Sequence, residues 1–239
     1  MFTFNRPFDP EQLRLLIFDL EGTLVDSRLD LIYSVNAMRR HLDLSDLSGE
    51  MIASYVGDGA AMLVRRALSD AGNGAGDEKF LRQATDYFLD YYGVHKLDHT
   101  RVYGGVIEML AAARTSRQGS SRQLAVLSNK PVIASRGVVD GLGIAHFFVA
   151  VCGGNSFATQ KPDPLGAQQI MEETGTEPDQ TLIVGDSAND VLTGRNAGAW
   201  TCGVTYGFAP QTLSAVAPDV VVDTADELRR LLAESVHEI

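Results

Sequence analysis

Short apolar runs recur along the chain, and acidic or turn-forming residues bound most of them. The clearest runs occupy residues 13–19 (LRLLIFD), 123–128 (QLAVLS), 147–152 (FFVAVC) and 181–186 (TLIVGD), with weaker ones at 201–204 and 219–222. Such continuous runs are typical of strands buried on both faces, as in a parallel sheet. Between them lies the helical spacing i, i+3, i+4, i+7, as in Val106, Met109, Leu110 and Ala113. Strands that alternate with helices predict an α/β fold with a doubly wound parallel sheet, a Rossmann-like core.

Residues 27–102 break this alternation, because they show helical patterns and no convincing strand. One predicted helical face carries Leu31, Val35, Met38 and Leu42. A second carries Phe80, Ala84, Tyr87, Phe88 and Tyr91. A block of this size is too long for a loop inside a compact domain. The sequence therefore predicts a catalytic α/β core at residues 1–26 and 103–239, with an inserted all-helical cap domain at residues 27–102.

Composition narrows the classes of partner. The chain has 239 residues and a formal net charge of −11. Nucleic acids and anionic membranes require basic surfaces, so neither is expected as a partner, and no apolar run approaches the ~20 residues of a membrane helix.

Residues 1–10 lack the order of a secretory signal, and Cys152 and Cys202 show no metal or redox spacing, which favours the cytoplasm. A small anionic substrate remains possible, since a bound cation sets the local field. The sequence leaves open whether the chain is a monomer or a homodimer.

The first candidate for chemistry is the pair Asp19 and Glu21. The run at residues 13–19 places Asp19 at the carboxyl end of a strand, where open α/β sheets bind ligands. A carboxylate there can attack phosphorus and form an aspartyl-phosphate. A second acid can protonate the leaving oxygen and then activate water. Gly22 and Thr23 suit a tight turn with exposed amides. The alternative is an aspartate that only caps the next element.

A second pair of acids, Asp186 and Asp190, follows another apolar run. Acids four residues apart fit one turn at the start of a helix. Their oxygens are the ligands that Mg²⁺ prefers. The alternative, an acidic helix N-terminus that interacts with the helix dipole, is common. Two strands that end in acids make this alternative less convincing.

Two further residues complete an ordered set. Ser128 ends a predicted strand and could donate a hydrogen bond to a phosphoryl oxygen. Lys161 could neutralise phosphate and the nearby carboxylates. Each is uninformative alone, and the significance lies in the order acid pair, serine, lysine, acid pair.

This ordered set resembles the haloacid dehalogenase superfamily over nearly the whole chain. The resemblance implies Asp19 as nucleophile, Glu21 as acid/base, and Ser128 and Lys161 as phosphate-binding residues. It further implies Mg²⁺ held by Asp19, the Glu21 backbone carbonyl and Asp186, with Asp190 orienting metal-bound water or Lys161. The residues expected to bind substrate are Thr23, Asn129, Gly57, Asp58 and Gly59.

Within the superfamily, residues 128–131 (SNKP), 184–187 (VGDS) and 204–207 (VTYG) are similar to bacterial phosphoglycolate phosphatases. The expected function is therefore a magnesium-dependent phosphatase that hydrolyses a small phosphate monoester through an aspartyl-phosphate. Glu21 stands where most phosphatases of the family have aspartate, and its extra methylene could slow or redirect turnover. The alternatives are a phosphosugar mutase or pyrophosphatase of the same family, or a catalytically weakened sensor of a phosphate ligand.

Overall fold

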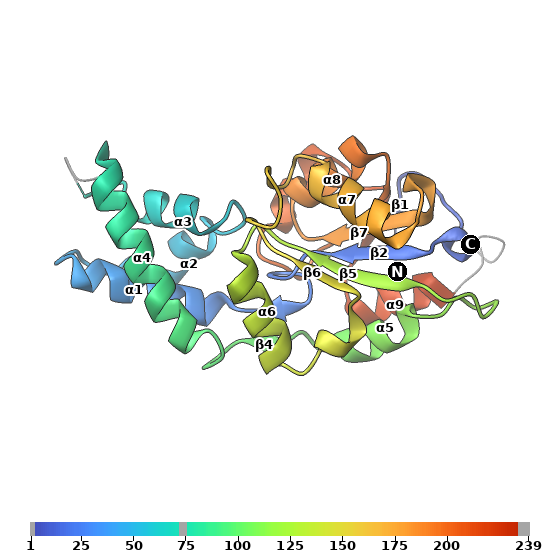
Figure 1. Cartoon of the computed structure of the whole chain (residues 1–239), viewed down its shortest axis with the longest axis horizontal. Coiled ribbons are helices and arrows are strands. Elements are labelled where there is room, and N and C mark those ends of the chain that lie inside the picture. Colours follow the sequence, from blue (N-terminus) through green and yellow to red (C-terminus); the bar gives the residue numbers. More distant parts are fainter. Residues whose placement is uncertain (1–2, 72–75, 234–239) are drawn as a thin grey trace. The chain divides into compact units, whose positions relative to one another are not determined.

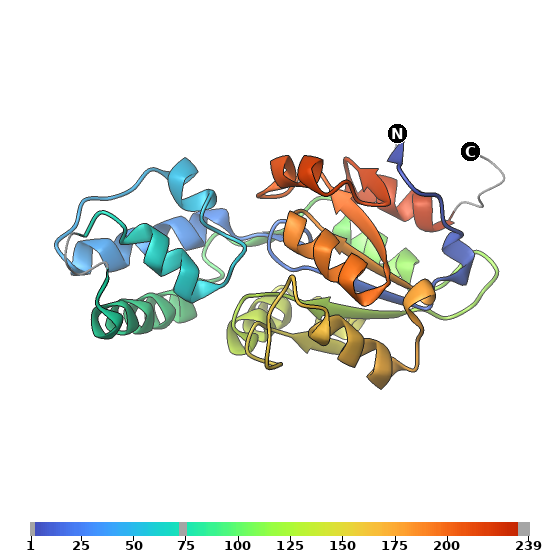
Figure 2. The same cartoon turned by 90° about the horizontal axis from the view of Figure 1, so that it is seen from above.

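The protein, described here by a computed structural model, divides into two compact units. Residues 3–71 and 76–233 are described. One unit, the α/β unit, comprises Met1–Asp26 and Val102–Ile239, and the other, the helical unit, comprises Ser27–Arg101. Figures 1 and 2 show both in two views. Among the described residues, no helix combines the length and apolar character that a membrane crossing requires.

A seven-stranded sheet forms the centre of the α/β unit, in the order β1-β9-β8-β7-β2-β5-β6. Its strands are β1 (Thr3–Phe4), β2 (Leu15–Phe18), β5 (Gln123–Leu127), β6 (Ala150–Cys152), β7 (Thr181–Gly185), β8 (Trp200–Val204) and β9 (Val220–Val222). All neighbours pair in parallel except β1, which pairs antiparallel with β9. The predicted doubly wound parallel sheet is confirmed, with two local differences. The antiparallel edge strand β1 was not predicted, and the run at 147–152 forms a strand only from Ala150, because a 3-10 helix occupies Ala145–Phe147.

Helices cover both faces of this sheet. Helices α5 (Val106–Ala113), α6 (Val132–Gly141) and α9 (Ala225–Ala233) contribute to one apolar cluster, which takes Leu16 and Phe18 from β2. Helix α7 (Leu165–Thr174) and α8 (Ala188–Ala197) contribute to the other, which takes Leu15 and Ile17. Figure 1 shows α7 and α8 on one side of the sheet and α5 and α9 on the other. Alternate residues of one strand thus point to opposite cores, which explains why β2 is apolar throughout.

The register of the three central strands determines where the polar loops meet. Strand β2 lies between β5 and β7, and Phe18 pairs with Val126 on one side and with Val184 on the other. The chain passes from β2 to β5 and β6 on one side, then returns to β7 on the other. Ligands of open α/β sheets bind at such a switch point, at the carboxyl ends of the strands. The residues that follow β2, β5 and β7 are therefore neighbours in space.

Among its described residues, the unit Ser27–Arg101 contains the α-helices α1 (Arg28–His41), α2 (Gly49–Ala53), α3 (Ala60–Ala67) and α4 (Glu78–His95). Figure 2 shows these helices grouped together. On α1, the predicted apolar residues Leu31, Val35 and Met38 are buried. On α4, the buried residues are Leu81, Ala84, Phe88 and Tyr92. The predicted face of α4 was thus partly wrong, because Phe80, Tyr87 and Tyr91 are only half-buried. A short strand, β4 (Arg101–Val102), pairs with β3 (Val25–Asp26), although no strand was predicted between residues 27 and 102.

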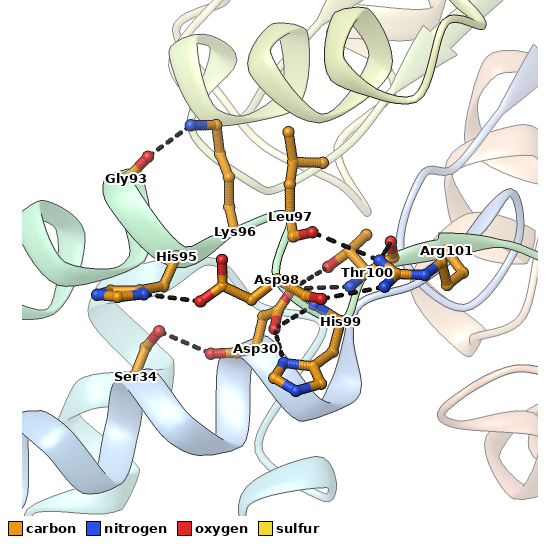
Figure 3. Close-up of polar contacts among 10 residues, drawn as sticks. All are labelled: Asp30, Ser34, Gly93, His95, Lys96, Leu97, Asp98, His99, Thr100 and Arg101. Atoms are coloured by element: carbon orange, nitrogen blue, oxygen red, sulfur yellow. Dashed lines mark hydrogen bonds and ion pairs between the residues drawn. The ribbon is translucent and has the colours of Figure 1, made fainter.

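A buried carboxylate, Asp30, ties the first turn of α1 to the segment that follows α4 (Figure 3). Its oxygens accept from the backbone N–H of His99 at 3.0 and 3.1 Å and of Thr100 at 2.8 Å, and from the Thr100 hydroxyl at 2.7 Å. The His99 Nδ1 atom lies 2.9 Å from Asp30 Oδ1. Burial alone would raise the pKa of Asp30, but the hydrogen bonds from Thr100 and His99 outweigh it and lower that pKa below its ordinary value.

Replacing Asp30 by asparagine is expected to lower the free energy of unfolding at pH 7 by about 2 kcal/mol, since hydrogen bonds to a charged group are lost. The folded-state pKa lies below the unfolded one, so this stabilisation is present above the ordinary aspartate range and is lost as pH falls through the folded pKa. Urea unfolding of wild type and Asp30→Asn at pH 3 to 7 measures the difference in their free energies of unfolding. The control is Asp98→Asn, an exposed aspartate of the same segment. A difference between wild type and Asp30→Asn that grows toward acidic pH would contradict the assignment.

Candidate active site

A buried lysine joins two of the predicted acids beyond the strand ends. The Lys161 Nζ atom lies 2.8 Å from Asp19 Oδ1 and 2.6 Å from Asp190 Oδ1. The side chains of Lys161, Asp19 and Asp190 are 4%, 13% and 2% exposed. Charges this poorly hydrated are stable only when opposite charges compensate one another. The three residues therefore form one electrostatic unit, although Asp19 follows β2, Lys161 precedes α7 and Asp190 lies in the first turn of α8.

Three carboxylates lie close enough together to share a cation. Asp19, Asp186 and Asp190 each offer an oxygen, and these oxygens lie within 4.8 Å of one another. The Oδ1 atom of Asp19 is buried and, although it forms the ion pair with Lys161, receives no hydrogen bond of good geometry from the described residues. Three carboxylates against one ammonium leave excess negative charge. An all-oxygen set with a net negative charge fits a hard divalent cation.

The pKa values of these acids reflect that crowding. Burial raises the pKa of Asp19 to about 6, with Lys161 opposing the rise and Asp190 adding to it. Burial, together with repulsion from Asp190 and Asp19, raises the pKa of Asp186 to about 7. Burial alone would lower the pKa of Lys161, but Asp19 and Asp190 raise it, so the lysine stays charged. An additional positive charge near these carboxylates would therefore stabilise their ionised forms.

Local backbone geometry fixes the orientation of the second acid pair. The backbone N–H groups of Phe208 and Ala209 donate to Asp186 Oδ2 at 2.5 and 3.0 Å. Asp190 Oδ2 accepts from the Ser187 N–H at 3.1 Å and its hydroxyl at 2.7 Å, which forms the capping box of α8. These hydrogen bonds leave Asp190 Oδ1 for the contact with Lys161 and engage only one oxygen of Asp186.

Gly22 lies directly against this acid pair. It has φ +81°, and a Cβ at this position would collide with the Asp186 carboxylate. Both the backbone conformation and the close approach therefore require glycine at this position.

The predicted phosphate-binding loop after β5 is also buried. Ser128 and Asn129 are buried at the end of this strand. The Asn129 side chain donates to the Lys161 carbonyl at 3.0 Å and accepts from the Lys161 N–H at 2.9 Å. Asn129, expected to bind substrate, thus uses its amide to hold the lysine backbone. The hydroxyl of Thr23 is buried without a hydrogen-bond partner among the described residues, while its carbonyl accepts from the Tyr206 hydroxyl at 3.0 Å.

Glu21 lies in a second ion pair. Its Oε1 atom is 2.8 Å from Lys130 Nζ, and the two side chains are 13% and 5% exposed. The sequence places Lys130 in the loop after β5, but no role was predicted for it. The two buried lysines therefore contact different acids: Lys161 contacts Asp19 and Asp190, and Lys130 contacts Glu21.

The other predicted residues, Gly57, Asp58 and Gly59, belong to the helical unit. The two glycines have φ values of +125° and +83°. The Asp58 carboxylate pairs with Arg66 at 2.5 Å, and Arg66 also donates to the Tyr55 carbonyl at 2.9 Å. This arginine is thus engaged within its own unit.

Sequence reasoning missed the residues that orient the acids. Lys130, Ser187 and the amides of Phe208 and Ala209 all contact a predicted site residue. The serine could have been found from the Ser-x-x-Asp spacing, which is related to a capping box. The amides carry no signal in the sequence, because any residue type supplies a backbone N–H.

Comparisons with known proteins show which family and which proteins this chain is similar to. A family model described as haloacid dehalogenase-like hydrolase matches residues 16–204. A phosphoglycolate phosphatase of Chromobacterium violaceum is 36% identical over 93% of this chain and 97% of its own length. One of Pseudomonas putida is 37% identical over 97% of this chain and 83% of its own length. The crystal structure of a predicted phosphoglycolate phosphatase from Haemophilus somnus superposes with a TM-score of 0.84 at 32% identity, over 92% of this chain and 98% of that one.

A divalent cation is expected to stabilise the protein, and more so at higher pH. The folded-state pKa values of Asp19 and Asp186, about 6 and about 7, lie above their ordinary value of 3.8, so the contribution of these groups to stability falls as pH rises through that window. A cation that replaces the protons reverses this loss. Mg²⁺ at ~100 times its Kd should contribute ~2.7 kcal/mol, which corresponds to roughly 5–10 °C in Tm.

Thermal unfolding with Mg²⁺ or with EDTA, at pH 5 to 8, measures this effect. Asp186→Asn should lose most of the rise in Tm, while the exposed Asp179→Asn should keep it. A rise of equal size in Asp186→Asn, or one that shrinks as pH increases, would show that the cation does not bind this cluster.

Proposed function

The chain belongs to the haloacid dehalogenase-like hydrolase family, and from that premise we propose that it is a magnesium-dependent phosphatase that hydrolyses a small phosphate monoester through Asp19. The observation that carries the proposal is the buried contact of Lys161 with Asp19 and Asp190 beside Asp186. Relatives named phosphoglycolate phosphatase make a phosphoglycolate-like ester the first substrate to test. Such an ester carries an anionic phosphate, which Lys161 would neutralise, and a leaving alkoxide, which Glu21 would protonate.

The cation would be held by Asp19, the Glu21 carbonyl and Asp186, and Asp190 would orient Lys161. When bound, Mg²⁺ supplies positive charge that balances the carboxylates and the phosphate. Lys161 adds a fixed ammonium, and its backbone is held by Asn129. Ser128 supplies a hydroxyl donor at the end of β5. These groups stabilise charge on the transferring phosphoryl group without having to reorganise during the reaction.

The proposed reaction has two steps. An Asp19 oxygen attacks phosphorus, the bond from phosphorus to the leaving oxygen breaks, and Glu21 gives that oxygen a proton. Glu21 then takes a proton from water, which attacks phosphorus, and the bond from phosphorus to Asp19 breaks to release phosphate. Splitting one difficult displacement into two steps is the benefit of a covalent intermediate, and a positioned acid/base contributes ~10²–10⁴-fold.

The same proposal assigns substrate selection to the helical unit as a cap. Gly57 and Gly59 have no side chains, so the amides of this loop are less shielded than those of a loop built from larger residues. The loop would contact the part of the substrate that does not react. We further propose a cytoplasmic setting, in line with two cysteines that form no disulfide, Cys152 and Cys202.

Asp19→Asn tests the mechanism directly, since the amide keeps the shape of the carboxylate but is a poor nucleophile. With Mg²⁺ and 2-phosphoglycolate, the variant should release phosphate at least ~10³-fold more slowly than wild type. Asp140→Asn, an exposed aspartate of α6, should leave the rate unchanged. Equal release by wild type and Asp19→Asn would overturn the proposed function.

Glu21→Asp tests whether glutamate is a working replacement for the usual aspartate. The shorter side chain should lose its 2.8 Å contact with Lys130, and a misplacement of ~1 Å lowers the rate by ~10²-fold. We therefore expect wild type to be active and the variant to be slower, in a steady-state assay of phosphate release. An inactive wild type that Glu21→Asp activates would instead support a sensor whose catalysis has been weakened.

A further inference from the structure

Lys130 is buried in a way that requires an explanation. Of the four lysines, Lys79, Lys96, Lys130 and Lys161, only the last two are buried. Lys161 contacts the proposed nucleophile, whereas the Lys130 ammonium, on a side chain 5% exposed, lies 2.8 Å from Glu21 Oε1. Burying an ammonium has a desolvation cost, which a specific partner must offset. That partner is the proposed acid/base.

The backbone of Lys130 is held in place on both sides. Its N–H donates to Ser128 Oγ at 3.4 Å, and its carbonyl accepts from the Gly154 N–H at 2.8 Å and the Ser135 hydroxyl at 3.3 Å. A Cβ on Gly153 would collide with the Lys130 carbonyl, so the loop after β6 packs tightly against this turn. The Lys130 side chain therefore extends from a backbone position that is held in place just after the end of β5.

The backbone of Glu21 is also constrained. Glu21 forms a bridge with Val25, and the Gly22 N–H donates to the Val25 carbonyl at 3.0 Å. Between its backbone and its carboxylate, however, a glutamate has one more rotatable bond than an aspartate and so more possible positions. An ion pair with a fixed ammonium reduces those positions to a narrow set.

We infer that Lys130 is a positioning residue that holds the Oε1 atom of Glu21, so that the other oxygen, Oε2, can carry the proton that is exchanged with the leaving oxygen, an inference that rests on the proposed function. In this role Lys130 would contact neither the leaving group nor phosphorus. It acts through Glu21 and limits the freedom that the additional methylene would otherwise allow. The Lys130–Glu21 pair thus involves a different lysine and a different acid from the contacts of Lys161 with Asp19 and Asp190.

The test separates this role from a purely structural one by the leaving group. The leaving group of an alkyl phosphate is a strongly basic alkoxide, which needs a proton as it departs. The leaving group of p-nitrophenyl phosphate, p-nitrophenolate, departs without one. Because kcat/KM covers the steps up to loss of the leaving group, only the alkyl ester should report on Glu21. A lysine that only supports the fold would affect both esters equally.

In the full chain with Mg²⁺, Lys130→Met should lower kcat/KM by ~10–100-fold for the best alkyl ester of a panel that includes 2-phosphoglycolate. For p-nitrophenyl phosphate the decrease should stay within ~3-fold. Lys79→Met, an exposed lysine of α4, is the matched control and should change neither value. Lys130→Gln replaces Lys130→Met if thermal unfolding shows that the methionine variant does not fold.

A double-mutant cycle with Glu21→Gln gives an independent result. In the Glu21→Gln background, removing Lys130 should have no further effect on the alkyl ester, since residues that act as a unit are not additive. Equal losses for both esters, or an undiminished Lys130 effect in the Glu21→Gln background, would overturn the inference. If Asp19→Asn is inactive while the Lys130 variants match wild type, the inference fails and the proposed function stands.

Discussion

The contacts of one buried ammonium, that of Lys161, with Asp19 and Asp190 are the interaction on which the rest of the site depends. Without this charge, three carboxylates would lie within 4.8 Å of one another with no lysine contact to compensate them. Even with it, the pKa values of Asp19 and Asp186 are raised to about 6 and about 7, chiefly by burial. Such a cluster of buried carboxylates lowers the stability of the protein, and a bound cation would offset that cost. Strongly shifted pKa values are therefore indicators of functional sites.

The fold makes this concentration of charge possible because its polar groups lie at the ends of strands and its apolar groups along them. Strand β2 is buried on both faces and paired on both edges, so its direction is fixed. Asp19 continues that direction, and its N–H still donates to the Val184 carbonyl at 2.9 Å. Backbone amides and Gly22 then orient Asp186 without any further charged side chain. Rigid elements of this kind hold reacting groups in place more accurately than flexible loops do.

Periodicity and ordered motifs were enough to predict the α/β sheet and the inserted helices. These patterns did not predict the features of the fold that depend on tertiary contacts. The two-residue strand β1 has too few residues to show a pattern, and on α4 the aromatic residues alone could not reveal that Leu81 and Tyr92 face the interior. The proximity of Asp19, Asp186, Asp190 and Lys161 was expected because Asp19 and Asp186 directly follow apolar strands, and because the ordered motifs group Lys161 and Asp190 with them. The contact of Lys130 was not predictable, because no pattern in the sequence shows which acid this lysine reaches across the loops.

The most direct measurement of the central claim is to locate the phosphoryl group during turnover. A reaction of full-length protein with Mg²⁺ and a small phosphate ester would be quenched in acid within the first turnovers, and its peptides analysed by mass spectrometry. The account predicts a phosphoryl group on the peptide that contains Asp19, attached to that aspartate. A phosphoryl group attached instead to Asp186 or Asp190, or rapid turnover with no covalently labelled peptide, would contradict it.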